Sequence, residues 1–83
     1  MYPRNYSNRP SALQRLLSAY EAQFRLSREQ YFEEQAYLQI IEFFEEDCQL
    51  SKALEASERS LRHHPSSAGL YLKKAQLLMD MKR

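Results

Sequence analysis

Two segments of this chain carry the same pattern of apolar residues at an offset of 34 positions. Residues 36–47 read AYLQIIEFFEED, and residues 70–81 read LYLKKAQLLMDM. In both segments, apolar residues recur at intervals of three and four, which is the spacing of one face of an α-helix. A helix that returns at a fixed period of this length predicts stacked helical hairpins. No other feature of the sequence constrains the fold as strongly.

The segment between the two copies predicts another helix and then a turn. The inward positions of this helix, which starts near residue 50, carry small side chains that would let a partner helix approach closely. Pro65 cannot continue a helix, and Ser66 or Ser67 can cap the next one. The stretch HHPSS, residues 63–67, is therefore interpreted as a connector between helices. The small inward residues are Ala53, Ala56, Ser57 and Ser60.

A further helix is predicted upstream, from residue 11 to about residue 26. Ser11 and Gln14 have the spacing of a capping box, and Pro10 precedes them, which is typical of a helix start. Apolar residues then recur at helical spacing and form one stripe.

The start of the following helix stays open between Ser27 and Glu34. Ser27 and Gln30 could cap it, or this segment could be a loop whose Tyr31 and Phe32 fill a gap in the core. From about Glu34 onwards the helical pattern is clear.

These elements predict an all-α fold of about four helices, arranged as antiparallel helical hairpins. One glycine and three prolines leave few positions for tight turns, which favours helices over a many-turned β fold. The expected organisation is a flexible N-terminal arm (residues 1–10), a flanking helix and connector (11–33), one helix–turn–helix unit (34–66), and the first helix of a second, incomplete unit (67–83).

The charge of the chain is balanced in total but not along its length. A formal net charge of +1 gives no argument for binding nucleic acid or a membrane surface. Residues 29–47, however, hold seven acids and no base, so the helix within them is expected to be acidic. The arm alternates Arg4 and Arg9 with tyrosines, and RNA contact through it is kept as the weakest alternative.

The sequence also bears on the compartment. Cys48 is the only cysteine, so no internal disulfide can form and a reducing environment fits. The N-terminal arginines are not followed by the apolar run of a signal peptide, and no stretch approaches the roughly 20 apolar residues of a membrane span. We therefore expect a cytoplasmic protein without a membrane segment.

The residues that could carry chemistry do not form a catalytic or metal-binding pattern. A zinc site needs three or four ligands, whereas His63 and His64 are adjacent at a helix end and Cys48 lies in another turn. The acids of FFEED, residues 43–47, are typical of a solvated helix end. The single glycine, Gly69, cannot supply a phosphate-binding loop. The sequence predicts no enzyme, no metal and no cofactor.

The period of 34, together with individual positions, resembles the tetratricopeptide repeat family over residues 34–83. The family places an aromatic residue early in the first helix of each unit, where this chain has Tyr37 and Tyr71. A large apolar residue near the end of that helix is matched by Phe44 and Leu78. Further matches are Ala75, Ala53, Ser60 and Pro65.

The chain also departs from the family pattern. Ile41 stands where the family has a small residue, and Ser57 where it has a large aromatic one. Cys48 and Lys82 replace the usual glycine of the turn within each unit. Because Ile41 and Ser57 differ in size from the family's residues, the distance between the packed helices is expected to differ from the family's at these two positions, while the fold is expected to be the same.

The resemblance implies a non-catalytic protein–protein interaction module, a scaffold of α-solenoid type whose first helices line a concave binding face. The subclass that clamps a C-terminal carboxylate with lysine and asparagine is not expected, because Leu38 and Glu42 occupy those places. The implied groove has an acidic rim with apolar spots, so its partner would be a basic or amphipathic peptide or helix. The implied residues are Gln35, Leu38, Glu42, Glu45, Glu46, Leu72, Gln76 and Met79.

An alternative function comes from the second copy of the repeated helix. The chain stops at Arg83, before any helix that would cover the apolar face of residues 67–81. Tyr71, Ala75 and Leu78 would then form an open apolar interface, and such faces usually mark an interface or a missing segment. Two interpretations stay open: the chain is a piece of a longer repeat protein, or two copies associate as a homodimer.

Overall fold

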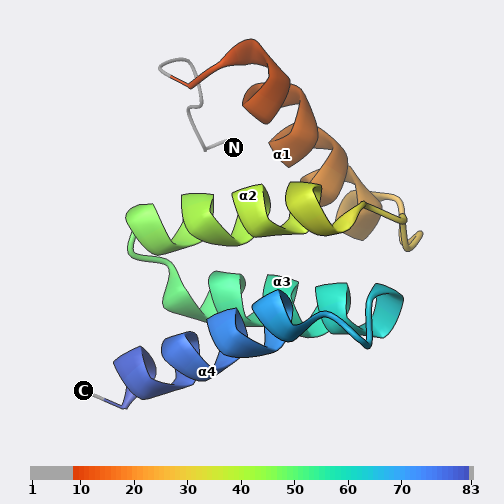
Figure 1. Ribbon diagram of the computed structural model, residues 1–83. Coiled ribbons are helices and arrows are strands. Elements are labelled where there is room, and N and C mark those ends of the chain that lie inside the picture. The colour runs from red at the N-terminus through yellow and green to blue at the C-terminus, as the bar shows by residue number, and fades with distance from the viewer. Residues whose placement is uncertain (1–8, 83) are drawn as a thin grey trace. The chain divides into compact units, whose positions relative to one another are not determined.

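The computed structural model describes residues 9–82, and the chain is folded into helices without strands over that range. It divides into two compact units, with the boundary between Gln30 and Tyr31. The predicted all-α fold of about four helices is confirmed for the described residues. Most of the predicted flexible arm, and Arg83, lie outside them. The helices are α1 (Ser11–Arg25), α2 (Glu34–Glu46), α3 (Leu50–His63) and α4 (Ala68–Met81) (Figure 1).

Helix α1 begins at the predicted residue but without the predicted capping box. Pro10 occupies the N-cap position and makes no side-chain cap hydrogen bond. Ser11 is already the first helical residue, one position too late to act as the cap. The Gln14 side chain instead donates from Nε2 to the carbonyl oxygen of Arg9 at 2.6 Å. The capping-box prediction was therefore wrong, although the predicted helix start was right.

The segment left open by the sequence is a loop. Helix α1 ends at Arg25. Two residues later the backbone of Ser27 is left-handed with φ of 54°, and the Arg28 N–H bonds to the carbonyl of Gln23 at 2.9 Å. The next helix starts only at Glu34. In the second unit Phe32 is buried beside Tyr37, while Tyr31 is exposed. Ser27 and Gln30 therefore do not cap a helix, and of the two aromatic residues only Phe32 fills the core.

A tight left-handed turn joins α2 to α3. Cys48 has a φ of 59°, the Cys48 N–H bonds to the carbonyl of Glu45 at 3.0 Å, and the Gln49 N–H bonds to the carbonyl of Phe44 at 2.8 Å. These two bonds satisfy carbonyls that the end of a helix leaves without an intrahelical partner. A glycine would adopt this backbone without strain, so Cys48 carries a conformational cost that a glycine would not.

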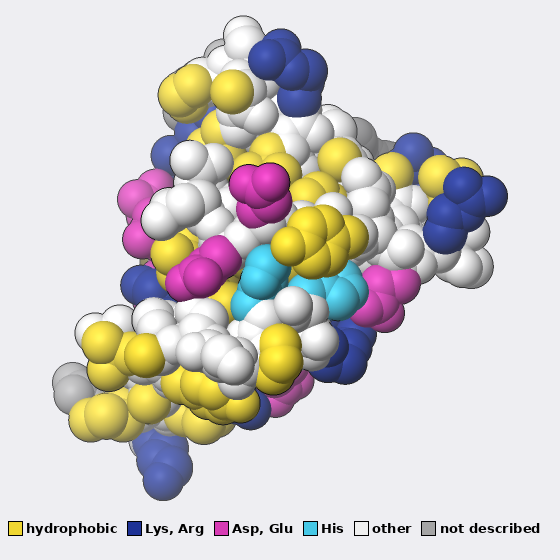
Figure 2. Space-filling model, turned by 45° about the vertical axis from the view of Figure 1, so that its right-hand side comes forward, with side chains coloured by type: hydrophobic (Ala, Val, Ile, Leu, Met, Phe, Trp, Pro, Cys, Tyr) yellow, Lys and Arg dark blue, Asp and Glu magenta, His cyan; other side chains and the backbone are white. Residues whose placement is uncertain are grey.

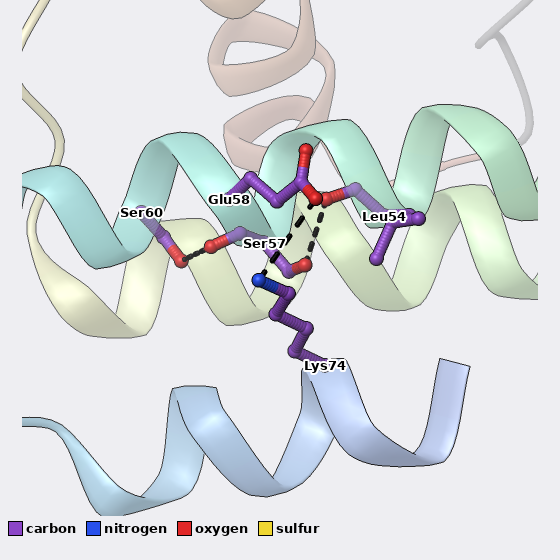
Figure 3. Close-up of polar contacts among 5 residues, drawn as sticks. All are labelled: Leu54, Ser57, Glu58, Ser60 and Lys74. Carbon is purple, nitrogen blue, oxygen red and sulfur yellow. Dashed lines mark hydrogen bonds and ion pairs between the residues drawn. The ribbon is translucent and has the colours of Figure 1, made fainter. Parts of the chain in front are cut away.

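Helix α3 lies between α2 and α4, and its inward side chains are small, as predicted. Ala53, Ala56, Ser57 and Ser60 are fully buried. The Ser57 hydroxyl donates to the carbonyl of Leu54 at 2.7 Å, and the Ser60 hydroxyl donates to the carbonyl of Ser57 at 2.6 Å (Figure 3). Because each hydroxyl bonds within its own helix, these serines avoid the cost of burying an unsatisfied polar group.

Helix α4 starts at a serine cap. The Ser67 hydroxyl accepts a hydrogen bond from the Leu70 N–H at 3.2 Å, which decides between the two predicted caps, Ser66 and Ser67. Helix α3 packs against both α2 and α4, and consecutive helices of this unit run antiparallel (Figure 1). Within residues 9–82, the helices are too short and too polar to cross a bilayer.

Candidate interaction surfaces

Polar contacts hold α4 against α2 at two points. Near the start of α4, the Ser67 hydroxyl donates to Glu34 Oε2 at 2.6 Å. Six residues further along the chain, Lys73 Nζ lies 3.0 Å from Glu45 Oε1, and the two side chains are only 19% and 23% exposed. Partly buried charge pairs are screened less than exposed ones. The two contacts therefore fix α2 and α4 side by side.

The eight residues implied as the groove lie on these two helices. Leu38, Glu42 and Glu45 follow one stripe of α2, and Leu72, Gln76 and Met79 occupy the same stripe of α4, 34 residues later. Glu45, the last residue of the α2 stripe, contacts Lys73, which follows Leu72 on α4. All eight are exposed or half-buried. We call them the α2–α4 surface: Gln35, Leu38, Glu42, Glu45, Glu46, Leu72, Gln76 and Met79.

The charge of the α2–α4 surface is concentrated at fewer residues than the sequence suggested. Glu45 was expected as part of an acidic rim, but its carboxylate is bound to Lys73. Glu42 is exposed at the middle of the α2 stripe, and the α4 stripe is uncharged. The surface therefore combines acidic character on α2 with apolar character on α4. Sequence reasoning missed the role of Lys73, whose side chain bridges the two copies of the repeated helix.

The predicted open interface lies on α4. Tyr71 is 53% exposed and Leu78 is 42% exposed, and Ala75 between them is also exposed. The large apolar residues beside them, Leu72 and Met79, are still more exposed. Figure 2 shows hydrophobic side chains gathered over the α4 end of the molecule, at the lower left. We call this set the α4 face: Tyr71, Leu72, Ala75, Leu78 and Met79.

The corresponding residues of α2 are covered. Tyr37 and Phe44, which precede Tyr71 and Leu78 by 34 residues, are 0% and 1% exposed. Tyr37 hydrogen-bonds to His63 at the end of α3, and Lys52 near the start of α3 lies over the Phe44 ring, with Nζ 5.8 Å from the centroid. Helix α3 therefore covers on α2 the same positions that are exposed on α4.

The two histidines lie at the end of α3, near the start of α2. The Tyr37 hydroxyl and His63 Nδ1 are 2.9 Å apart, and His64 Nε2 lies 2.8 Å from the carbonyl oxygen of Phe32. The Tyr31 ring lies 5.4 Å from both imidazole rings, and the histidines are seen side by side at the centre of Figure 2. The pair thus links the end of α3 to the segment leading into α2. Sequence reasoning identified only the helix stop here.

The other residues considered for chemistry are spread over the unit. Cys48 is exposed in the α2–α3 turn, whereas His63 ends α3, and a helix of 14 residues separates two such points by about 21 Å. Among residues 9–82, no group of three or more His, Cys, Asp or Glu side chains could hold a metal ion. The thiol and the imidazoles therefore do not meet in one site.

No family model, no curated protein and no solved structure matches the chain.

Proposed function

We propose that residues 34–83 form a protein-binding module of the tetratricopeptide type, and that the α2–α4 surface binds a basic or amphipathic segment of a partner protein. The observation that carries the proposal is the pairing of α2 and α4 through Glu34–Ser67 and Glu45–Lys73. It sets an exposed acid, Glu42, on one helix beside exposed apolar residues on the other. This combination suits a partner with both positive charge and an apolar face.

The repeated architecture supports the same proposal. Glu33 and Ser67, the residues that precede α2 and α4, are 34 positions apart, and the small residues of α3 are buried between its neighbours. Repeat modules built in this way present extended faces for partner binding. The step from this architecture to function is an analogy, so a binding experiment is needed to test the proposal.

Two synthetic peptides provide the test. One is a fluorescein-labelled amphipathic helix with leucines on one face and lysines on the other, and its counterpart has glutamate in place of each lysine. We expect fluorescence anisotropy to show binding of the lysine peptide that weakens with added salt, and binding of the glutamate peptide that is about tenfold weaker or more.

Charge reversal then locates the binding face. Glu42→Lys should weaken binding of the lysine peptide by roughly three- to tenfold, and Gln76→Lys should act in the same direction from α4. Glu55→Lys on α3 is the matched control, because the Glu55 side chain is 54% exposed and its contact with Arg59 is long, at 3.7 Å. Glu45→Lys is unsuitable, since it would also break the contact with Lys73. Equal binding of both peptides, or equal effects of Glu42→Lys and Glu55→Lys, would exclude the proposed surface.

A further inference from the structure

The α4 face has the side-chain pattern of a packed helix face but is exposed. Three of its residues, Tyr71, Ala75 and Leu78, match positions of α2 that are almost completely buried, Tyr37, Ile41 and Phe44. On α4, Tyr71 and Leu78 are about half exposed, and Leu72 and Met79 are 65% and 62% exposed. Contiguous apolar surface of this kind on a protein marks an interaction site.

The two lysines of α4 are turned away from this face. Lys73 is bound to Glu45 on α2, and Lys74 Nζ lies 3.9 Å from Glu58 Oε2 on α3 (Figure 3). The five residues of the α4 face are uncharged. In a two-fold symmetric contact each residue of a face meets the same face of the other copy, so any net charge there would oppose itself. The α4 face meets that requirement.

The sizes of the side chains are arranged symmetrically about Ala75. Leu72 and Leu78 lie three residues to either side of it, and Tyr71 and Met79 lie four residues to either side. If two copies of α4 cross antiparallel at Ala75, Leu72 of one copy lies beside Leu78 of the other, and Tyr71 lies beside Met79. The small residue stands at the point of closest approach, where a large one would hold the helices apart.

The ends of α4 favour the same direction. Glu34 binds Ser67 at the beginning of α4, and Lys82 follows its last residue. An antiparallel arrangement brings the Lys82 end of one copy to the Glu34 end of the other. A parallel arrangement would place the two lysines together and the two carboxylates together.

We propose that the α4 face is a self-association surface, on which a second copy of this chain docks antiparallel with the two-fold axis at Ala75. The contact is small. A 14-residue helix is about 21 Å long and about 10 Å wide, so one helix face per copy falls short of the roughly 800 Å² per partner of a standard interface. The dimer is therefore weak and its population depends on protein concentration.

The self-association surface also regulates the proposed binding function, and this part of the inference rests on that function. Leu72 and Met79 belong to both the α2–α4 surface and the α4 face. A partner segment and a second copy cannot occupy them together. Partner binding and dimerisation are consequently mutually exclusive.

The first test is the solution mass of the chain by sedimentation equilibrium over about 1 µM to 1 mM, the range in which weak complexes dissociate. We expect a reversible dimer, and Leu78→Glu should raise its dissociation constant about tenfold or more by placing a charge in the contact. Ser51→Glu, which adds the same charge at an exposed position of α3, should leave it unchanged. A wild-type monomer throughout, or a dimer that survives Leu78→Glu, overturns the proposal.

The second test is disulfide trapping in a Cys48→Ser background, which removes the native thiol. Under mild oxidation Ala75→Cys should give a covalent dimer, because residue 75 faces itself across the axis. Met79→Cys should not, because in an antiparallel pair the two residues at position 79 lie about 12 Å apart along the helix axis. Efficient trapping of Met79→Cys, or none of Ala75→Cys, excludes the antiparallel arrangement.

The two proposals can fail separately. Leu78 lies outside the α2–α4 surface, so Leu78→Glu should still bind the lysine peptide. If the peptide does not bind but Leu78→Glu abolishes a dimer, only the binding function fails. If both the peptide and the second copy bind, adding the peptide should dissociate the dimer, and a dimer that persists at saturating peptide would disprove mutual exclusion.

Discussion

Helices α2 and α4 carry the same apolar pattern in different surroundings. Tyr37 and Phe44 of α2 are buried under α3, whereas Tyr71 and Leu78, at the same positions of α4, are exposed. The pattern therefore marks a helix face that can pack, without specifying what packs on it. The difference arises from α3, which contacts Tyr37 through His63 and Phe44 through Lys52 on one helix only. On α4, the buried residues are Leu70 and Leu77, and Lys74 forms an ion pair with Glu58 of α3.

Truncating equivalent residues should give the largest difference between the two helices. We expect Phe44→Ala to lower the free energy of unfolding by about 3–5 kcal/mol, because it leaves a cavity in the core. Leu78→Ala should lower it by less than about 1 kcal/mol, since its side chain is already partly in water. Urea denaturation followed by circular dichroism, at a concentration where the chain is monomeric, measures both.

A small domain can lose its fold entirely at a cost of this size. If Phe44→Ala is unfolded without urea, Phe44→Leu provides a smaller change at the same position. The comparison between α2 and α4 would be refuted if truncation at residue 78 cost as much as truncation at residue 44.

Removing the tyrosine hydroxyl near the start of each helix provides a second comparison between α2 and α4. Tyr37→Phe should destabilise the chain by about 0.5–1.5 kcal/mol, because the hydroxyl bonds to His63 Nδ1 at 2.9 Å within the hairpin. Tyr71→Phe removes a hydroxyl from an exposed ring and should change stability by no more than a few tenths of a kcal/mol. Thermal unfolding of both variants side by side measures this difference, and equal effects would argue against the Tyr37–His63 contact.

Substitutions in the turns that follow α2 and α4 should give the smallest difference in stability. Cys48 has left-handed backbone, while Lys82, 34 residues later, is right-handed with φ of −79°. Relief of left-handed strain is worth about 1–2 kcal/mol, and the added freedom of glycine in the unfolded chain offsets about 0.4–1 kcal/mol. Cys48→Gly should therefore stabilise the chain by about 0.5 kcal/mol.

Lys82→Gly serves as the matched control for this turn. Its backbone is already unstrained, so glycine there should give no stabilisation. A loss of stability in Cys48→Gly, measured by urea denaturation under reducing conditions, would contradict the left-handed turn.

Local sequence signals were sufficient for the helices. Regular apolar spacing located α2 and α4, Pro65 ended α3, and Ser67 capped α4 as one of two predicted candidates. The prediction of the cap at the start of α1 failed by one residue. Ser11 has the right spacing to Gln14 for a capping box but is already inside the helix. Capping depends on backbone angles at one position, and residue type alone does not determine them.

Contacts between distant residues were not predictable in the same way. The Glu45–Lys73 and Tyr37–His63 contacts join residues 28 and 26 positions apart. Each depends on how antiparallel or neighbouring helices are aligned, which follows from packing rather than from local preference. The acidic composition of α2 was evident from the sequence. That Glu45 is neutralised by Lys73 became evident only once α4 was placed.

The short connectors have a consequence for the time in which this unit folds. Three residues, 47–49, separate α2 from α3, and four residues, 64–67, separate α3 from α4. Helix α3 thus packs on the helices that directly precede and follow it in the chain, so little chain must be closed into loops before these contacts form. Units dominated by such short-range contacts fold within microseconds to milliseconds. Residues 31–82 should accordingly reach their native arrangement quickly.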